Sequence, residues 1–468
     1  MSAPAEASAG PESGADGRQE AAGSGALGAI AAFQAEFSDF GALPETVRQQ
    51  TRRCLTDLIG VAAAGSRTEL GMIIAAHAGD QFAAGARPAS ILFDAHGRKA
   101  SAAGAALAGG MTIDAIDAHD GHPLTKGHAG CGLFPALAAL AETEAPDMPL
   151  EVFLGHLAVG YEIAIRCGIA LHATAPDYHT SGAWIAVGIA ATGAPILKLD
   201  RGAMRHAMGI AEYHGPRSQM MRCIDHPTMV KDGSGWGAMA GVSALMLARS
   251  GFTGAPALTI EDPAVADLLT DLGTRWRIGE QYFKPWPVCR WAQPAVEAAF
   301  ALRRDHALDP ADIAAVRVRT FHEATRLAAR RPADTEQAQY SLPFPMAAML
   351  VHGRLGVAEI GGTGLADPAV LDLADGIELI DDARFDAVFP AERWAEVEID
   401  LRDGRTVRSA PLTARGDADG PLPDDEIMAK FHALMSEAGH ADRAGPIERM
   451  VKTPGTATVR DLIALVSA

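Results

Sequence analysis

The segment WAEVEIDLRDGRTVRSA, residues 394–410, carries the strongest strand pattern in a chain of 468 residues. Apolar and polar side chains alternate on both sides of Asp403-Gly404, as they do in strands with one buried face. An Asp-Gly pair supplies the positive φ angles that a tight hairpin turn requires. We therefore expect a β-hairpin here, and the alternating segment AAVRVRTF, residues 314–321, predicts a further strand of the same small α+β unit.

Helical patterns lie on both sides of these strands. In residues 44–64 apolar side chains recur at roughly helical intervals among charges, which is typical of an amphipathic helix. The same pattern predicts further helices over Ala102–Gly109, Pro135–Glu144, Leu150–Leu171, Gly182–Ala194, Arg201–Ile210, Trp236–Arg249, Pro294–Asp305, Leu342–Gly353, Asp424–Ala438, Ile447–Val451 and Val459–Val466.

The order of these elements predicts a mainly α fold. A large helical domain over residues 26–269 is interrupted by a smaller α+β domain over 270–410, and the helices of 411–468 return to the first domain. Many Ala and Gly residues favour closely packed helices. Residues 1–25 read as a disordered tail, without the basic start and apolar core of a secretory signal.

Composition excludes several classes of protein. A formal charge of −18 argues against a nucleic-acid or anionic-membrane partner, although a few cations in one cleft can still bind an anionic substrate. The five cysteines are widely spaced without CxxC, so we expect neither disulfides nor a zinc ribbon, and a cytoplasmic location. Residues 181–199 come nearest to a membrane span, but Pro195 favours a buried helix ending near it.

Residues 114–131, DAIDAHDGHPLTKGHAGC, form the densest polar cluster of the chain. It lies between two Ala-rich helices, where buried polar groups are costly unless they serve a purpose. Catalysis or substrate binding is the leading interpretation, with a metal site or a purely structural network as alternatives. The candidate residues are Asp117, His119, Asp120, His122 and His128.

Three further clusters follow. His179 precedes an apolar helix, where a capping or core role is the simpler alternative. Arg217 and Arg222 could bind carboxylates bidentately, and Lys231 could exchange protons, although this stretch could also be a polar surface connection. In KPWPVCRW, residues 284–291, prolines stiffen a loop that presents Lys284, Cys289 and Arg290, or an aromatic hinge between domains.

The sequence lacks the motifs that carry other chemistries. It contains no GxSxG elbow, Walker loop, HExxH helix, or GxGxxG after a strand. The clusters thus offer acids, bases and anion binders, but no carrier for hydride or phosphoryl transfer.

These clusters, in this order, resemble the MmgE/PrpD family. Asp117-Ala-His-Asp120 followed by His128-Ala-Gly is similar to its acidic motif and downstream histidine. His179 resembles its second active-site histidine, and Lys231, ahead of a Gly/Ala-rich helix, resembles its active-site lysine. KPWPVCRW resembles its Lys-x-Tyr-Pro segment, and QYSLPFPMAAML, residues 339–350, fits its C-terminal domain.

The resemblance implies a helical domain with an α+β lid, a homodimer, and catalysis without metal or organic cofactor. The activity it implies is that of a lyase of the dehydratase type, which removes a proton α to a carboxylate of a small polycarboxylic acid. The catalytic candidates are then Asp117, His128, His179 and Lys231, and the substrate-binding candidates are His119, Asp120, His122, Arg217, Arg222, Lys284, Cys289 and Arg290.

Four alternatives stay open. Returning the proton to the opposite face would make the protein an epimerase of a substituted succinate, and a cis-aconitate-type decarboxylase is a second related activity. A metal-dependent hydrolase could use Asp117, His119, His122 and His128. A helical binding or scaffold protein would show no turnover at all.

Overall fold

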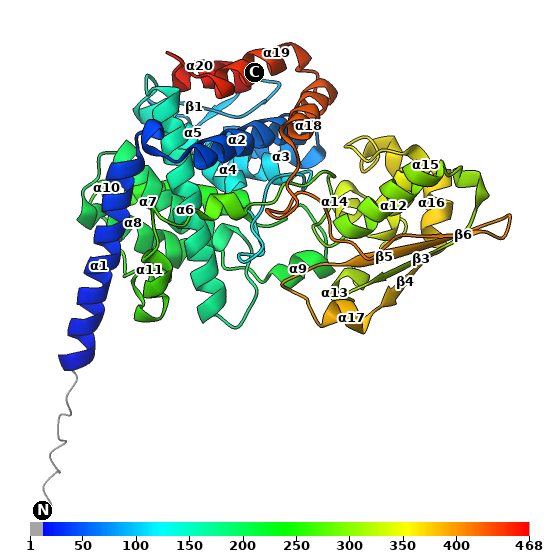
Figure 1. Ribbon diagram of the computed structural model, residues 1–468. Helices are drawn as coiled ribbons and strands as arrows, with labels where there is room; N and C mark the ends of the chain where they lie inside the picture. Colours follow the sequence, from blue (N-terminus) through cyan, green and yellow to red (C-terminus); the bar gives the residue numbers. More distant parts are fainter. Residues whose placement is uncertain (1–12, 468) are drawn as a thin grey trace, which may run out of the picture.

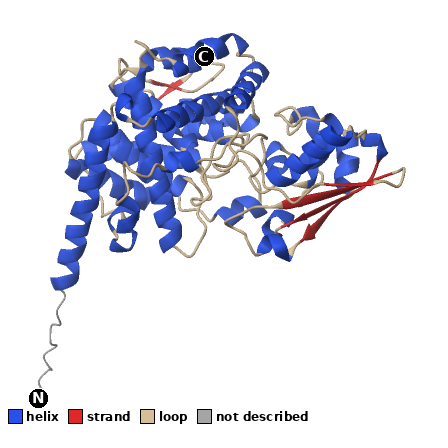
Figure 2. Ribbon diagram, viewed as in Figure 1, coloured by secondary structure: helices blue, strands red, loops and turns tan. Residues whose placement is uncertain are grey.

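Two hydrophobic cores divide the chain, of which the computed structural model describes residues 13–467. The larger core draws its side chains from residues 27–283 and again from 422–466. The smaller core uses mainly residues 288–407. Figures 1 and 2 show the first as a helical body and the second as a smaller lid that contains a sheet. The expected mainly helical fold with a smaller α+β lid is therefore confirmed.

The body is built from consecutive helices and closed by the last helices of the chain. Its elements are α1 (Ser13–Phe37), α2 (Glu45–Gly65), α3 (Glu69–Gln81), α4 (Ala102–Asp114), α5 (Gly130–Glu144), α6 (Leu150–Thr174), α7 (Gly182–Ile196), α8 (Arg201–His214), α9 (Met220–Asp225), α10 (Ser234–Arg249), α11 (Leu258–Glu261), α18 (Asp424–Glu437), α19 (Ala441–Lys452) and α20 (Val459–Val466), with a short pairing of β1 (Ala89–Ser90) and β2 (Lys99–Ala100).

Every helix expected from the sequence is present, and the differences lie mainly at helix ends. Helix α5 begins at Gly130 rather than near Pro135, which lies inside the helix. A proline there leaves one helical carbonyl without its amide partner but does not end this buried helix. Helices α1, α3, α9 and α11 of the body have no counterpart among the expected helices.

The structure describes the expected N-terminal tail only from Ser13 onward. Helix α1 starts at Ser13, so residues 13–25 are helical where a disordered tail was expected. The first twelve residues of the expected tail lie outside the described residues.

Small side chains allow the central helices to approach closely. A Cβ atom on Gly110 of α4 would lie 2.6 Å from the Cα atom of Gly235 of α10. Within the described residues, α6 is long and apolar enough to span a membrane, but 89% of its most apolar window is buried in the body. That burial is typical of a core helix.

The lid is a mixed sheet with helices against it. The strand order is β4-β3-β5-β6, with β4 (Ile377–Asp381) parallel to β3 (Ile313–Thr320), and β5 (Ala395–Leu401) antiparallel to both β3 and β6 (Thr406–Arg408). Its helices are α12 (Gln293–His306), α13 (His322–Thr325), α14 (Thr335–Gln339), α15 (Pro343–His352), α16 (Pro368–Asp375) and α17 (Ala383–Asp386). Figure 1 shows α12, α15 and α16 on one face of the sheet.

The expected hairpin is formed by β5 and β6. Gly404 adopts φ 88° in the turn, a conformation that glycine reaches without steric cost. Strand β4 was not expected, because its short segment lacks the alternation that identified β3 and β5.

Helix α18 returns from the lid and packs on α2 of the body. A Cβ atom on Gly60 would lie 3.1 Å from the ring of Phe431, so the two helices are in close contact. Lys430 of α18 donates to Asp57 of α2 at 2.7 Å and to the carbonyl oxygen of Ala118 at 2.5 Å. The returning helix thereby supports the loop that carries the densest polar cluster.

Candidate active site

The loop between α4 and α5 carries Asp117 on a strained backbone. Asp117 has φ 48°, in the left-handed region that side chains other than glycine rarely adopt. The ammonium group of Lys284 donates to its carboxylate and also, at 3.0 Å, to its backbone carbonyl. Both side chains are buried. Burial alone would raise the pKa of Asp117, but Lys284, Lys231 and His128 lower it below its ordinary value.

Lys231 occupies a second strained position, just before α10, with φ 49°. Its buried ammonium group donates to the side-chain oxygen of Gln339, and the amide of Gln339 donates to the carbonyl of Ala115 at 2.8 Å. The nitrogen also lies 5.0 Å from the ring centre of Tyr340. Because Gln339 belongs to the lid, these contacts join the lid both to Lys231 and directly to the start of the Asp117 loop.

His128 is held in one tautomer by the backbone. Its Nδ1 atom lies 2.6 Å from the carbonyl oxygen of Asp120, which can only accept a hydrogen bond, so Nδ1 carries the proton and Nε2 has a free lone pair. Burial, followed by the positive charge of Lys284, lowers the pKa of His128 to about 3. The imidazole is therefore neutral at physiological pH, with Nε2 unprotonated.

A buried network of acids and hydroxyls joins three of the predicted clusters. The backbone N–H of His128 donates to Ser181 Oγ at 2.9 Å, and Ser181 in turn donates to Asp232 through its hydroxyl and, at 3.0 Å, through its backbone N–H. Asp114 accepts from Ser234 and from the N–H of Asp232. Burial and the nearby Asp114 raise the pKa of Asp232 to about 8, so this pair retains a proton at neutral pH.

Asp120 acts through its neighbours. It accepts from Tyr161 at 2.7 Å and from Gln281 at 2.8 Å, while its own carbonyl orients His128. Burial raises the pKa of its carboxyl group to about 7. Gly130 makes this arrangement possible, since a Cβ atom there would lie 2.0 Å from the hydroxyl of Tyr161.

His119 is fully buried beside His128, with 4.3 Å between ring centres. Neither of its ring nitrogens has a hydrogen-bond partner among the described residues, and burial lowers its pKa well below the ordinary value. Ligand atoms of Asp117, His119 and His128 lie within 4.8 Å of one another, so these three could hold a metal ion. The adjacent ammonium groups of Lys231 and Lys284 oppose a divalent cation there.

A cavity of about 510 Å³ opens beside Lys231. Arg222, His226 and Trp236 line it together with Lys231 and Thr180. Arg222 is exposed within it, whereas Lys231 lies at the buried side. The cavity therefore connects Lys231 with solvent and brings a guanidinium group near it.

Four predicted residues are engaged elsewhere. Arg217, in the loop that follows α8, is exposed and lines a separate cavity of about 720 Å³ with Arg205 and Tyr213. His122 pairs with Glu280 at 3.1 Å. Arg290 pairs with Asp417 at 2.5 Å and lies 4.5 Å from the ring centre of Tyr282, so neither its charge nor its flat face is free.

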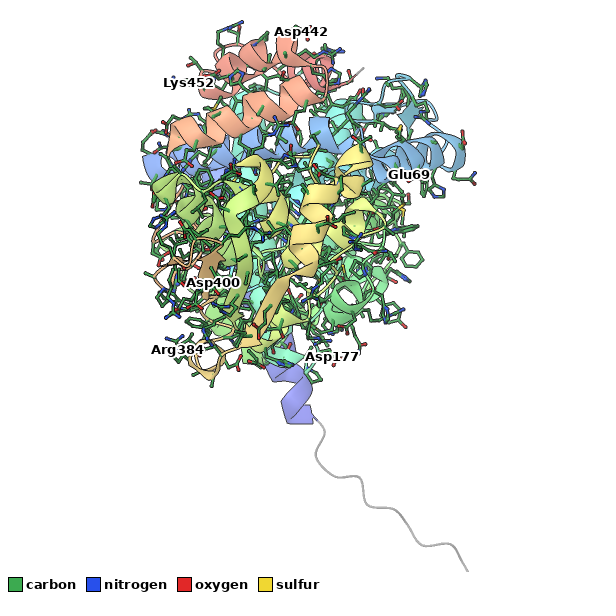
Figure 3. The ribbon with its side chains drawn as sticks, turned by 90° about the vertical axis from the view of Figure 1, so that its right-hand side faces the viewer. Glu69, Asp177, Arg384, Asp400, Asp442 and Lys452 are labelled. Atoms are coloured by element: carbon green, nitrogen blue, oxygen red, sulfur yellow. The ribbon has the colours of Figure 1, made fainter. Side chains whose placement is uncertain are left out.

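His179 is the fourth. It lies on the loop that leads to Ser181, and in residues 13–467 no hydrogen bond or ion pair joins it to Asp117, His128 or Lys231. Burial and the charge of Arg217 lower its pKa. Asp177, two residues earlier, reaches the lower rim of the molecule in Figure 3. His179 is thus buried, but within the described residues it is joined to none of these three side chains.

Cys289 lies in the buried group, and its backbone N–H donates to the carbonyl of Gln339 at 2.9 Å. Burial, then the charge of Asp117, raises the pKa of its thiol to about 12, so the thiol stays protonated. We call Asp117, His128, Lys231, Lys284, Cys289 and Gln339 together the buried group. It combines a neutral base, His128, with the cations Lys231 and Lys284.

Sequence reasoning missed several contributors. Gln339, Tyr340 and Ser181 contact predicted residues directly, and Asp232 contacts Ser181. Gln339 and Tyr340 lie in the quoted QYSLPFPMAAML segment, which was used only to place the second domain. These two polar residues come shortly before a buried helix, and that position in the sequence could have indicated a role in the site.

Comparison with known proteins agrees with this architecture. The MmgE/PrpD N-terminal domain matches residues 28–272, and the MmgE/PrpD C-terminal domain matches residues 286–453. The chain is 25% identical over 417 residues to the cis-aconitate decarboxylase-like protein oryM of Aspergillus oryzae, covering 78% of this chain and 82% of the relative. It is 24% identical over 454 residues to cis-aconitate decarboxylase of Homo sapiens, covering 88% of each chain.

Proposed function

The chain belongs to the MmgE/PrpD family of enzymes acting on carboxylic acids, and we propose that it is a lyase that removes a proton α to a carboxylate of a small polycarboxylic acid. One observation carries the proposal. The unprotonated Nε2 atom of neutral His128 shares a buried site with the ammonium groups of Lys231 and Lys284.

His128 is the general base in this proposal. A general base must be unprotonated at the working pH and correctly oriented, and the carbonyl of Asp120 fixes both the tautomer and the orientation of His128. Asp117 has a different role, because its carboxylate is already occupied by Lys284. It holds that lysine in place.

Lys231 and Lys284 stabilise the negative charge that develops. When the α C–H bond breaks, its electron pair moves into the neighbouring carboxylate and forms an enediolate. A cation fixed before the reaction stabilises such charge more strongly in a water-poor site than in solvent. Gln339 and Asp117 fix the two ammonium groups through hydrogen bonds.

The preferred outcome is elimination. The electron pair returns to form a C=C bond while the β C–O bond breaks, and the leaving hydroxyl takes a proton from Lys231 and departs as water. Lys231 then regains a proton from solvent through the adjoining cavity. In that cavity Arg222 lies where it could bind a carboxylate outside the buried group.

Decarboxylation is the second candidate, and the names of the two relatives favour it. In this reaction the C–C bond to a carboxylate breaks, carbon dioxide leaves, and the ammonium group of Lys231 donates a proton to the carbon that receives the electron pair. Lys231 then regains a proton from solvent through the adjoining cavity. The same cations serve both reactions, whereas only elimination needs His128 as a base.

Product analysis in deuterated water separates these reactions. We would incubate the enzyme with citrate-type hydroxy acids, cis-aconitate and substituted succinates, and follow products by NMR. Alkene and water from a hydroxy acid support elimination, carbon dioxide from cis-aconitate supports decarboxylation, and deuterium uptake without an alkene supports epimerisation. H306A, which alters an exposed histidine of α12, is the matched control for H128A.

No turnover with any of these acids would contradict the proposal. A metal-dependent hydrolase would instead require stoichiometric metal in the purified protein and lose activity to a chelator.

A further inference from the structure

The imidazole of His119 is buried without a hydrogen bond. Its exposed fraction is 0%, and within residues 13–467 neither ring nitrogen has a partner. The other histidines of the same loop are both engaged, since His128 bonds to the carbonyl of Asp120 and His122 pairs with Glu280. Because a buried polar group without a partner costs free energy, a fold that retains one needs a reason.

A carboxylate oxygen without a partner lies next to His119. Oδ1 of Asp114 is 3.8 Å from Nε2 of His119, and this oxygen also lacks a hydrogen bond among the described residues. The other oxygen, Oδ2, accepts from the hydroxyl of Ser234 at 3.0 Å and from the backbone N–H of Asp232 at 3.2 Å. Asp114 is therefore fixed in place, with one oxygen left to face His119.

His119 also contacts the proposed base. Its ring centre lies 4.3 Å from that of His128, and ligand atoms of these two histidines and Asp117 all lie within 4.8 Å of one another. Polar atoms at such separations can be connected by one water molecule or by a small rotation of the rings. His119 thus joins His128 to Asp114.

The proposed elimination leaves a proton on His128, which must lose it before the next turnover. Its pKa of about 3 means that it gives this proton up readily. Asp117 is a poor acceptor, because Lys284 occupies its carboxylate and its pKa is lowered. Burial raises the pKa of Asp114, and the pair of Asp114 and Asp232, which retains one proton at neutral pH, can accept a second.

We infer that His119 and Asp114 form a relay that carries the proton from His128 toward solvent after each elimination. The inference rests on the proposed function and adds two residues to it. The proton on Nε2 of His128 passes to Nε2 of His119 and from there to Oδ1 of Asp114, which releases it to water. No other bond forms or breaks, and each group returns to its initial protonation state.

The relay ends close to the cavity of about 510 Å³ beside Lys231. Asp232, whose N–H bonds to Asp114, lies in the chain between Lys231 and Gly233, and both of these residues line the cavity. A proton on Asp114 is therefore close to a space that opens to solvent. His128 is buried, so a proton that stayed on it would leave more slowly.

The test separates the first turnover from later ones. His128 is neutral in the resting enzyme, so the first proton removal does not need the relay, whereas each later one does. Rapid-quench measurements would follow product per active site in wild type, H119L and D114N, with the citrate-type hydroxy acid that wild type converts best. In both variants we expect about one product per active site at nearly the wild-type rate, followed by a steady rate lowered by about a hundredfold.

Further variants make the result specific. H156L replaces another buried histidine, in α6, and should match wild type in both phases. H119Q is a polar replacement that tests the same relay if H119L does not fold, and it should show the same two phases. Thermal unfolding of each variant checks that its fold is intact.

Three results would overturn the relay. Equal slowing of first and later turnovers in the His119 and Asp114 variants, or no slowing at all, would leave these residues without a role in proton transfer and the proposed function standing. Stoichiometric metal in the active wild-type enzyme would make His119 a ligand instead. If wild type eliminated water from none of the acids, the proposed elimination would be wrong, and the relay with it.

Discussion

The ammonium group of Lys284 donates to both the carboxylate and the backbone carbonyl of Asp117, residues 167 positions apart in the chain. Asp117 itself has a left-handed backbone, as does Lys231. Such conformations cost of order 1–3 kcal/mol each and persist only where the surroundings hold them, often at functional sites. The two strained residues contribute to one buried group with His128.

Removing Lys284 should destabilise the protein strongly. K284M leaves the carboxylate of Asp117 buried without its partner, and we expect a loss of about 3–5 kcal/mol in the free energy of unfolding. The double variant D117N/K284M removes the uncompensated charge and should regain part of that loss. Urea unfolding of both, with K452M as a control for an exposed lysine, measures the difference. Equal stability of the single and double variants would show that the ion pair is not what holds this loop.

His128 and His179 should differ in their contributions. H128A removes the proposed base, and its loss should reduce kcat by about 10²–10⁴-fold. H179A should have a smaller effect, because His179 makes no direct contact with the buried group in the described part of the chain. Steady-state kinetics on the substrate identified by the product panel compares them. A larger effect for H179A would move the base to that residue.

The pH dependence of activity should lack a limb from His128 near neutrality. Its pKa of about 3 means that the imidazole loses its proton well below the ordinary range and stays neutral from about pH 5 upward. In kcat/KM, the acid limb due to this group should therefore lie below pH 5. If wild type shows a limb near pH 6.5 that H128Q abolishes, the histidine is not held neutral by burial and Lys284.

Asp232 should make stability fall as pH rises. Burial raises its pKa to about 8, so between about pH 4 and pH 8 the folded protein retains a proton that the unfolded chain has released. Rising pH then favours unfolding, by at most about 1.4 kcal/mol per pH unit for one proton. D232N cannot lose this proton, so its stability relative to wild type should increase over that window.

Thermal unfolding at several pH values measures this difference, and D419N, which alters an exposed carboxylate, is the matched control. A difference between D232N and wild type that does not change with pH would contradict the proposed protonation of Asp232.

Gln339 should act by positioning Lys231. Q339L removes both its hydrogen bond from the ammonium group and its bond to the carbonyl of Ala115. We expect kcat to fall by about tenfold to a hundredfold, because a misplaced catalytic group costs rate even when the fold is intact. Q337L, whose parent side chain bonds only Asp334 and its own loop, is the control. An unchanged kcat in Q339L would show that Lys231 needs no support from the lid.

Sequence patterns predicted helices and strands well where apolar residues recur at regular spacing. The hairpin at Asp403-Gly404 and helix α20 were found where expected, because alternation and helical spacing reflect burial directly. Strand β4 was missed, since five residues beside a longer strand carry little pattern of their own.

The site was predicted only in part for a related reason. Asp117, His128, Lys231 and Lys284 stand out as charged or polar residues in apolar surroundings, and the fold gathers them. Partners such as Gln339 and Tyr340 come from distant segments, so only the packing of the lid on the body reveals them. Arg217 shows the converse, because a basic residue near the right motif can still face solvent.

The central claim is that His128 removes a proton next to a carboxylate, and solvent exchange tests it most directly. Wild type, H128Q and the control H306A would be incubated in deuterated water with the polycarboxylic acid that the enzyme converts, and deuterium at its α carbon followed by NMR. The account predicts exchange in wild type and H306A, and a loss of at least about a hundredfold in H128Q. Undiminished exchange in H128Q would contradict it.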